Sequence, residues 1–168
     1  MLSTAKVHAA VFGETKPQDY ALSILLSRML LAPATYLIGN GGSASICSHI
    51  AVDYCKYLGV KARSLNDPMM LSCVANDYGW ESVFRKQLEW YASPKDALIA
   101  ISSSGASPNI LGAARWAAEE GLFVVTLSAF KPNNPLREKG AINFYVDTVK
   151  YRVAEITHLS ILHELADV

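Results

Sequence analysis

The stretch from Tyr36 to Asp53 constrains the fold of this chain more than any other. A short apolar run, Tyr36-Leu37-Ile38, ends in the turn Gly39-Asn40-Gly41-Gly42 and gives way to apolar residues at helical spacing. This pattern predicts a strand, a tight loop and the first turn of a helix. The first N–H groups of a helix have no intrahelical partner and carry partial positive charge, so such a turn favours a bound anion. Asn40 and the glycines let the backbone approach a ligand closely, and Ser43 either caps the helix or donates its hydroxyl to the anion.

Strands and helices are expected to alternate along the rest of the chain. Apolar runs predict strands, and apolar residues at helical spacing predict helices. The strands cover residues 36–39, 62–65, 97–102, 123–128 and 143–146, and the helices cover 43–57, 69–75, 81–91, 110–120 and 151 to the end. Residues 76–79 read as a loop, and residues 2–32 show a helical pattern with a break between Gly13 and Pro17. The alternation predicts a three-layer α/β fold with a parallel sheet, in which ligands bind at the carboxyl ends of the strands.

Composition limits the classes of function. The 168 residues suffice for one domain with a sizeable core, and Lys plus Arg equals Asp plus Glu at 15 each, which indicates neither a nucleic-acid partner nor a membrane surface. No run reaches the ~20 apolar residues that span a bilayer, and no secretion signal is recognisable, so we expect a cytoplasmic protein. The cysteines lack a Cys-x-x-Cys pattern and are expected to be reduced thiols in or near the core. They are Cys47, Cys55 and Cys73.

The segment from Ala21 to Leu31 is unusually apolar. Its hydrophobic residues cover more than one stripe of a helix, and hydrophobic residues make up 51% of the whole chain. A helix of this kind must be covered on two sides. We therefore expect contacts with its own domain and with another chain.

A second polar turn follows the buried run Ala97 to Ser102. It reads Ser103-Ser104-Gly105-Ala106-Ser107-Pro108-Asn109, where Pro108 suits a first helical turn and Ser107 its N-cap. A turn with a cap accounts for one or two of these serines. A cradle of neutral hydroxyl donors for a phosphate monoester accounts for all four, Ser102, Ser103, Ser104 and Ser107. Because both polar turns follow parallel strands, we expect them to converge on one pocket.

Ionisable side chains gather on the second and last predicted helices. His49 and Asp53 are four residues apart and therefore about 40° apart on one helix face. They form either a surface or partner contact, or a site for acid/base or metal chemistry beyond the phosphate. Glu155 and His163 differ by about 80° in direction and ~12 Å in height, so a zinc site between helices or between chains is easier to build from them than one on a single helix.

Two further residues keep more than one interpretation. His158 lies among apolar neighbours and is interpreted as a structural or supporting histidine. Asp77 belongs either to an ordinary Asx turn and helix start or to a pocket wall that accepts hydrogen bonds from sugar hydroxyls.

In this order and spacing, the motifs resemble the SIS (sugar isomerase) domain and, within it, the phosphoheptose isomerase family. The matching residues are Gly39-Asn40-Gly41-Gly42-Ser43, His49 with Asp53, Asn76-Asp77-Tyr78-Gly79, the serine turn through Asn109, and His158 with His163. The resemblance implies a flavodoxin-like five-stranded parallel sheet in a single SIS domain over residues 1–168. Within it, an N-terminal helical segment over residues 1–32 helps assemble a homotetramer, and residues 33–168 form the α/β core. It also implies active sites at subunit interfaces.

The resemblance also implies a reaction and roles for residues. The family converts sedoheptulose 7-phosphate to D-glycero-D-manno-heptose 7-phosphate for surface glycans. By motif match, Asp77 lines the sugar and His163 is the catalytic histidine. The substrate would be bound by Asn40, Gly41, Gly42, Ser43 and the four serines of the second turn. Some members bind zinc through positions that correspond to His49, Asp53, Glu155 and His163.

This chain departs from the family pattern at three positions. Asp53 stands where the family has a glutamate base, and one methylene less moves the carboxylate by about 1 Å. Glu155 replaces a glutamine, and Arg152 stands where an aspartate is expected. Two carboxylates and two imidazoles should hold a divalent cation more tightly, and either Asp53 or Glu155 is the expected base. A tetrameric adaptor protein and a sugar-phosphate sensor are the alternatives, but the retained acid/base pair favours an enzyme.

Overall fold

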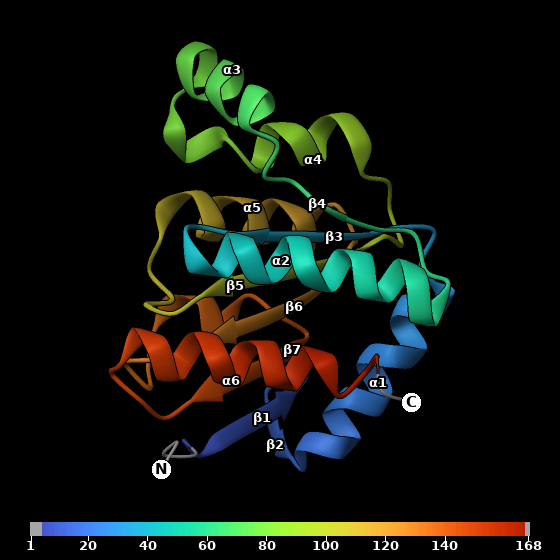
Figure 1. Cartoon of the computed structure of the whole chain (residues 1–168), viewed down its shortest axis with the longest axis vertical. Helices are drawn as coiled ribbons and strands as arrows, with labels where there is room; N and C mark the ends of the chain where they lie inside the picture. The colour runs from blue at the N-terminus through green and yellow to red at the C-terminus, as the bar shows by residue number, and fades with distance from the viewer. Residues whose placement is uncertain (1–4, 167–168) are drawn as a thin grey trace.

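One mixed sheet of seven strands runs through the computed structural model, which describes residues 5–166 (Figure 1). The strand order is β2-β1-β7-β6-β5-β3-β4. The strands are β1 Val7–Val11, β2 Glu14–Lys16, β3 Thr35–Gly39, β4 Ala62–Ser64, β5 Ala97–Ser102, β6 Phe123–Ser128 and β7 Ile142–Val146. The helices are α1 Gln18–Leu31, α2 Gly42–Asp53, α3 Pro68–Tyr78, α4 Arg85–Tyr91, α5 Pro108–Glu119 and α6 Tyr151–His163. Short helical turns cover η1 Tyr54–Leu58, η2 Trp80–Ser82 and η3 Pro135–Glu138.

Five strands are parallel to their neighbours and form the core of the sheet, in the order β4-β3-β5-β6-β7. Counted along the chain from β3, this is the order 2-1-3-4-5 of flavodoxin-like folds. The expected fold class is therefore confirmed. The sheet is larger than the expected five strands, because an antiparallel hairpin of β1 and β2 is added at the edge of β7.

This hairpin corrects the predicted helical pattern at the N-terminus. Strand β1 pairs antiparallel with β7 over its whole length, with Val7 opposite Val146 and Val11 opposite Ile142. The helical pattern was wrong for residues 7–11, because pairing with a distant strand decides the conformation of such a short segment, whereas β2 lies within the predicted break. Residues 2–4 of that segment lie outside the described residues. Helix α1 begins after Pro17, as the predicted break requires.

Helices cover both faces of the sheet. Helices α1, α2 and α6 pack on one face through a core that includes Leu25, Ile50 and Leu162. Helices α3, α4 and α5 pack on the other face, around residues such as Leu88 and Ile110. Strand β5 is buried along its whole length, as its continuous apolar run predicts.

Several boundaries differ from the predicted ones. Helix α2 ends at Asp53 and continues as the π-helical turn η1. Helix α3 extends through Tyr78, so the predicted loop over residues 76–79 was wrong, and so was the Asx-turn interpretation of Asp77. Of the cysteines, only Cys47 is buried, whereas Cys55 and Cys73 are exposed. None of the helices among residues 5–166 is long and apolar enough to cross a membrane.

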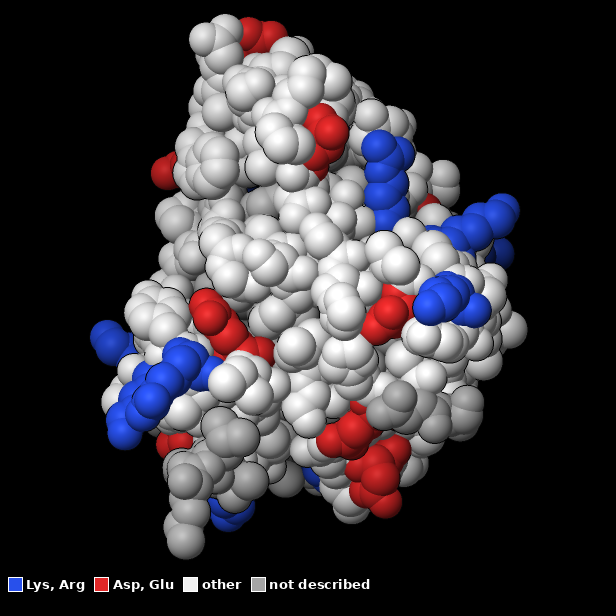
Figure 2. All heavy atoms as spheres, in the orientation of Figure 1, with Lys and Arg blue, Asp and Glu red and all other residues white. Residues whose placement is uncertain are grey.

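Charged side chains of both signs are interspersed among uncharged ones on the face that Figure 2 shows. This distribution agrees with the even balance of acidic and basic residues in the sequence. Overall charge therefore does not mark a functional site on this face, and the local geometry at the ends of strands and helices has to identify one.

Candidate active site

The two polar turns lie together at the carboxyl ends of neighbouring strands. Strands β3 and β5 are adjacent and parallel, with Gly39 opposite Ile101 at the end of the ladder. Just beyond it, Nδ2 of Asn40 donates to Oδ1 of Asn109 at 3.0 Å, and Nδ2 of Asn109 donates to Oδ1 of Asn40 at 2.9 Å. The two turns therefore lie side by side, as their positions after neighbouring parallel strands predict.

The first polar turn is tight and leads into α2, whose N-terminus has no side-chain cap. The N-cap of α2 is Gly41, whose φ of +54° suits glycine and which has no side chain to cap the helix. A Cβ added at Gly39 would lie 2.7 Å from the carbonyl carbon of Ser43, so the turn requires glycine there as well. Ser43 lies within α2 and does not occupy the cap position. The N–H groups of Ser43 and Ala44 donate to the carbonyls of Asn40 and Gly41, whereas no backbone acceptor faces those of Gly41 and Gly42 among the described residues. The N–H groups of these two glycines are therefore placed to meet an anion.

The second turn gathers hydroxyl groups. Oγ of Ser102 lies 3.4 Å from Oγ of Ser104 and 3.2 Å from Oγ of Ser107. Ser107 is the N-cap residue of α5, and Pro108 occupies the first turn, as predicted. The Ser107 side chain makes no cap hydrogen bond and instead joins the hydroxyl cluster. Ser103 is buried, and its carbonyl accepts a hydrogen bond from the N–H of Ala129.

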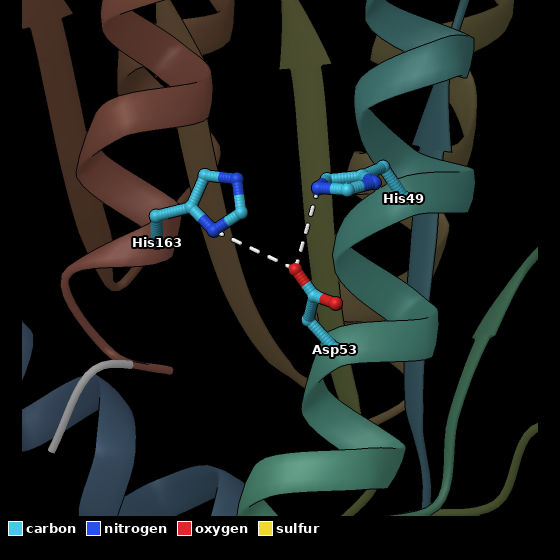
Figure 3. A group of neighbouring side chains, drawn as sticks. All are labelled: His49, Asp53 and His163. Carbon is cyan, nitrogen blue, oxygen red and sulfur yellow. Dashed lines mark ion pairs between the residues drawn. The ribbon is translucent and has the colours of Figure 1, made fainter.

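A second group of residues lies between α2 and α6. Oδ2 of Asp53 is 3.3 Å from Nε2 of His49 and 3.5 Å from Nδ1 of His163 (Figure 3). The two imidazole rings meet edge to face, with centroids 5.1 Å apart. One donor atom from each of the three residues lies within 4.8 Å of the others. Three of the four residues expected to bind metal are therefore brought together.

Glu155, the fourth of these residues, does not join the other three in the structure. A Cβ added at Gly42 would collide with the Glu155 carboxylate, so this carboxylate lies against the first turn of α2. The rise of α6 separates it from His163 by ~12 Å along the helix axis. Glu155 thus lies beside the first polar turn, whereas His163 lies beside Asp53 at the other end of α6.

Asp77 and His158 lie apart from these two groups. Asp77 is exposed near the end of α3, which packs on the opposite face of the sheet from α2 and α6, and Oδ1 of Asp77 accepts from Nδ2 of Asn76. His158 is fully buried, and its Nε2 lies 3.2 Å from the carbonyl oxygen of Ser128. Burial lowers the pKa of His158 to about 4, despite that hydrogen bond, and keeps the ring neutral at physiological pH. The structural interpretation of His158 fits this environment.

Sequence reasoning gave no role to Asn109. It is 1% exposed, and a buried amide at the second position of a helix is uncommon. The sequence does hold one signal for a paired role. Asn109 directly follows Pro108, and Asn40 stands in the matching turn after the neighbouring strand.

Comparisons with known proteins identify the family. The SIS domain model matches residues 20–129. The phosphoheptose isomerase of Cytophaga hutchinsonii is 39% identical over 134 residues, which are 76% of this chain and 69% of that protein. The phosphoheptose isomerase of Geotalea uraniireducens is 31% identical over 172 residues, which are 98% of this chain and 90% of that protein. The chain belongs to the phosphoheptose isomerase family of SIS-domain proteins.

A solved structure supports this membership. The phosphoheptose isomerase GmhA from Neisseria gonorrhoeae superimposes with a TM-score of 0.81 at 26% identity, over 90% of this chain and 83% of that one. The resemblance on which the sequence interpretation rests is therefore confirmed. Membership in the phosphoheptose isomerase family also identifies the chain as one of a group of enzymes that act on sugar phosphates.

Proposed function

We propose that this chain is an aldose–ketose isomerase that interconverts sedoheptulose 7-phosphate and D-glycero-D-manno-heptose 7-phosphate. The observation that carries the proposal is the Asp53 carboxylate between two imidazoles, in a chain whose relatives over most of its length are phosphoheptose isomerases. The adaptor and sensor alternatives are not favoured, because neither needs an acid/base group beside a phosphate site.

The phosphate binds at the two polar turns. Neutral donors hold it: the hydroxyls of the serine turn, that of Ser43, and the N–H groups of the Asn40-Gly41-Gly42 turn. His49 lies seven residues beyond Gly42, or ~10 Å along α2. The phosphate and the carbonyl of a heptulose 7-phosphate lie at opposite ends of the sugar, which matches the separation between the turns and His49, whose Nε2 lies 3.3 Å from Oδ2 of Asp53.

Asp53 and His163 move the protons. Both imidazoles face Oδ2 of Asp53, which leaves Oδ1 to take the proton from C1 of the ketose and return it to C2. His163 protonates O2 and removes the proton from O1, and the intermediate between the two steps is an enediol. Glu155 is the alternative base, but it lies beside Gly42 at the phosphate end.

Zinc fits the donor set of His49, Asp53 and His163. Donor atoms on a tetrahedral zinc ion at 2.0–2.1 Å are about 3.3 Å apart, and the two nitrogens lie 3.3 and 3.5 Å from Oδ2 of Asp53. Three protein ligands leave one position open, which is typical of catalytic zinc. When bound there, zinc polarises the sugar carbonyl.

A homotetramer with active sites at its subunit interfaces completes the proposal. Leu30 and Leu31 of α1 are exposed, with Leu31 at 81%, and Val52 and Tyr57 are exposed near the end of α2. Contacts between copies would cover these apolar side chains. The same contacts would bring Asp77 to the sugar from another copy, since α3 packs on the other face of its own sheet.

Turnover in deuterated water tests the function. The protein is incubated with sedoheptulose 7-phosphate, with and without added zinc, and an aldose product carrying deuterium at C2 is expected. His163→Ala should abolish turnover and retain phosphate binding, whereas His8→Ala, in β1 and remote from the site, should stay active. His49→Ala should lower the zinc content of the purified protein. No turnover and no exchange by the wild type, or full activity of His163→Ala, would overturn the proposal.

A further inference from the structure

The side-chain amides of Asn40 and Asn109 bond to each other between the two polar turns and are not among the groups proposed to contact the phosphate. We propose that Asn40 and Asn109 form a latch that sets the separation of the two phosphate-binding turns, and that both are positioning residues. This inference rests on the proposed function, because it concerns how the same site holds its phosphate.

The latch has a defined orientation. Besides the two reciprocal bonds, Oδ1 of Asn109 accepts the backbone N–H of Ile110 at 3.0 Å. An oxygen is therefore required at that position, so Nδ2 of Asn109 must face Oδ1 of Asn40. Asn109 is buried, and loss of Asn40 would leave its Nδ2 as a buried donor without a hydrogen-bond partner, while its Oδ1 would keep the bond from Ile110.

The latch lies where strand pairing no longer holds the turns together. The ladder between β3 and β5 ends at Gly39 and Ile101. Beyond it, among the described residues, the Asn40–Asn109 pair provides the hydrogen bonds that link one turn to the other. A phosphate that accepts bonds from both turns at once requires a fixed separation, and an error near 1 Å in such a site is costly.

This geometry gives Asn40 a different role from the expected one. Both polar atoms of its side chain bond to Asn109, and its backbone carbonyl accepts from the N–H of Ser43 at 3.0 Å. The substrate then meets the N–H groups of Gly41 and Gly42, while the Asn40 side chain holds those groups at the correct distance from the serine turn.

Alanine variants of the two asparagines test the latch. Dissociation constants for inorganic phosphate and for sedoheptulose 7-phosphate are measured by calorimetry for Asn40→Ala, Asn109→Ala and the double variant, together with kcat and KM. Each single variant should raise both dissociation constants and KM by about tenfold, with kcat within about twofold, because the acid/base groups lie elsewhere. The double variant should bind no more weakly than the weaker single variant, because the two amides act as one unit.

Asn143→Ala is the matched control. Asn143 is also buried, in β7, and its Nδ2 donates to Oγ1 of Thr126 at 2.7 Å. Its loss should lower the unfolding midpoint and leave phosphate affinity unchanged. If Asn109→Ala does not fold, Asn40→Ala decides alone, because Asn40 is only half-buried.

Three results would overturn the latch. They are unchanged phosphate affinity in the folded single variants, additive losses in the double variant, and no phosphate binding by the wild type. Failure of the latch can be distinguished from failure of the proposed isomerase activity, because phosphate binding is measured without turnover. A wild type that binds phosphate without isomerising the sugar would refute the function and still allow the latch to be tested.

Discussion

The carboxylate of Glu155 in α6 lies against the backbone of Gly42 in the first turn of α2. The family resemblance implies a glutamine at position 155, so this chain has an acidic residue where the resemblance implies a neutral amide. A helix start favours a bound anion, and a nearby carboxylate opposes one. At the proposed phosphate-binding turn, this chain therefore differs electrostatically from the pattern that the resemblance implies.

Glu155→Gln should strengthen phosphate binding. Removal of the like charge is expected to lower the dissociation constant of inorganic phosphate by about three- to tenfold, and more at low ionic strength. Calorimetry at two salt concentrations measures the effect, and Glu119→Gln, at the far end of α5, controls for net charge. A large fall in kcat in the same variant would instead identify Glu155 as the base, and equal affinity in both variants would contradict the electrostatic argument.

Gly42→Ala should change kcat/KM by displacing the Glu155 carboxylate from the first turn of α2. The added methyl group would overlap the carboxylate, which can move away because it is the end of a flexible side chain. We expect kcat/KM to change more in the wild-type background than in a Glu155→Ala background, a coupling that a double-mutant cycle measures. Gly112→Ala in α5, where the nearest atom is 3.9 Å away, should leave activity unchanged and stabilise the fold by up to about 1 kcal/mol. Additive effects of Gly42→Ala and Glu155→Ala would rule out the contact as the cause.

His158 should make stability fall below neutral pH. Its pKa is lowered by burial to about 4 in the folded protein, from 6.5 in the unfolded chain. Between these values the unfolded state binds more protons, so the free energy of unfolding decreases as the pH falls from 6.5 to 4 and this contribution levels off below that. The total is on the order of 3 kcal/mol. Urea unfolding between pH 4.5 and 7.5 should give a flatter profile for His158→Gln, and parallel profiles for both proteins would contradict the assignment.

Two of the three thiols should react quickly in the native protein. Cys55 and Cys73 are exposed, whereas Cys47 is fully buried, and burial raises the pKa of its thiol. Ellman's reagent should modify two thiols rapidly and the third only after unfolding. The double variant Cys55→Ser/Cys73→Ser should show no fast phase, and a fast third thiol in the wild type would show that Cys47 is accessible.

The central strands could be predicted closely because burial on both faces leaves a clear pattern. Strands β5 and β6 have the predicted bounds, 97–102 and 123–128. The β1–β2 hairpin could not be predicted in the same way, because its conformation depends on pairing with β7, more than 120 residues later in the chain. The loop predicted over residues 76–79 was wrong for a related reason, since apolar contacts of α3 with the rest of the domain accompany a helix that extends through Tyr78.

The site was predictable in its parts and less so in its arrangement. Helical spacing placed His49 and Asp53 on one face, and both polar turns were expected at one pocket. Whether Glu155 or His163 lies next to Asp53 depends on how α6 packs beside α2, which spacing along one helix does not determine. The bond between Asn40 and Asn109 joins residues 69 positions apart and leaves no periodic signal in the sequence.

The short hairpin at the N-terminus has a consequence for solubility. Strand β1 occupies the outer hydrogen-bonding edge of β7, and the sheet then ends at β2, three residues long with Glu14 and Lys16 paired at 2.8 Å. Short, charged edge strands resist pairing with other molecules, whereas a bare β7 would offer five apolar-rich residues to a neighbouring chain. A version shortened to begin at residue 20 would keep every proposed catalytic group and become prone to lateral aggregation.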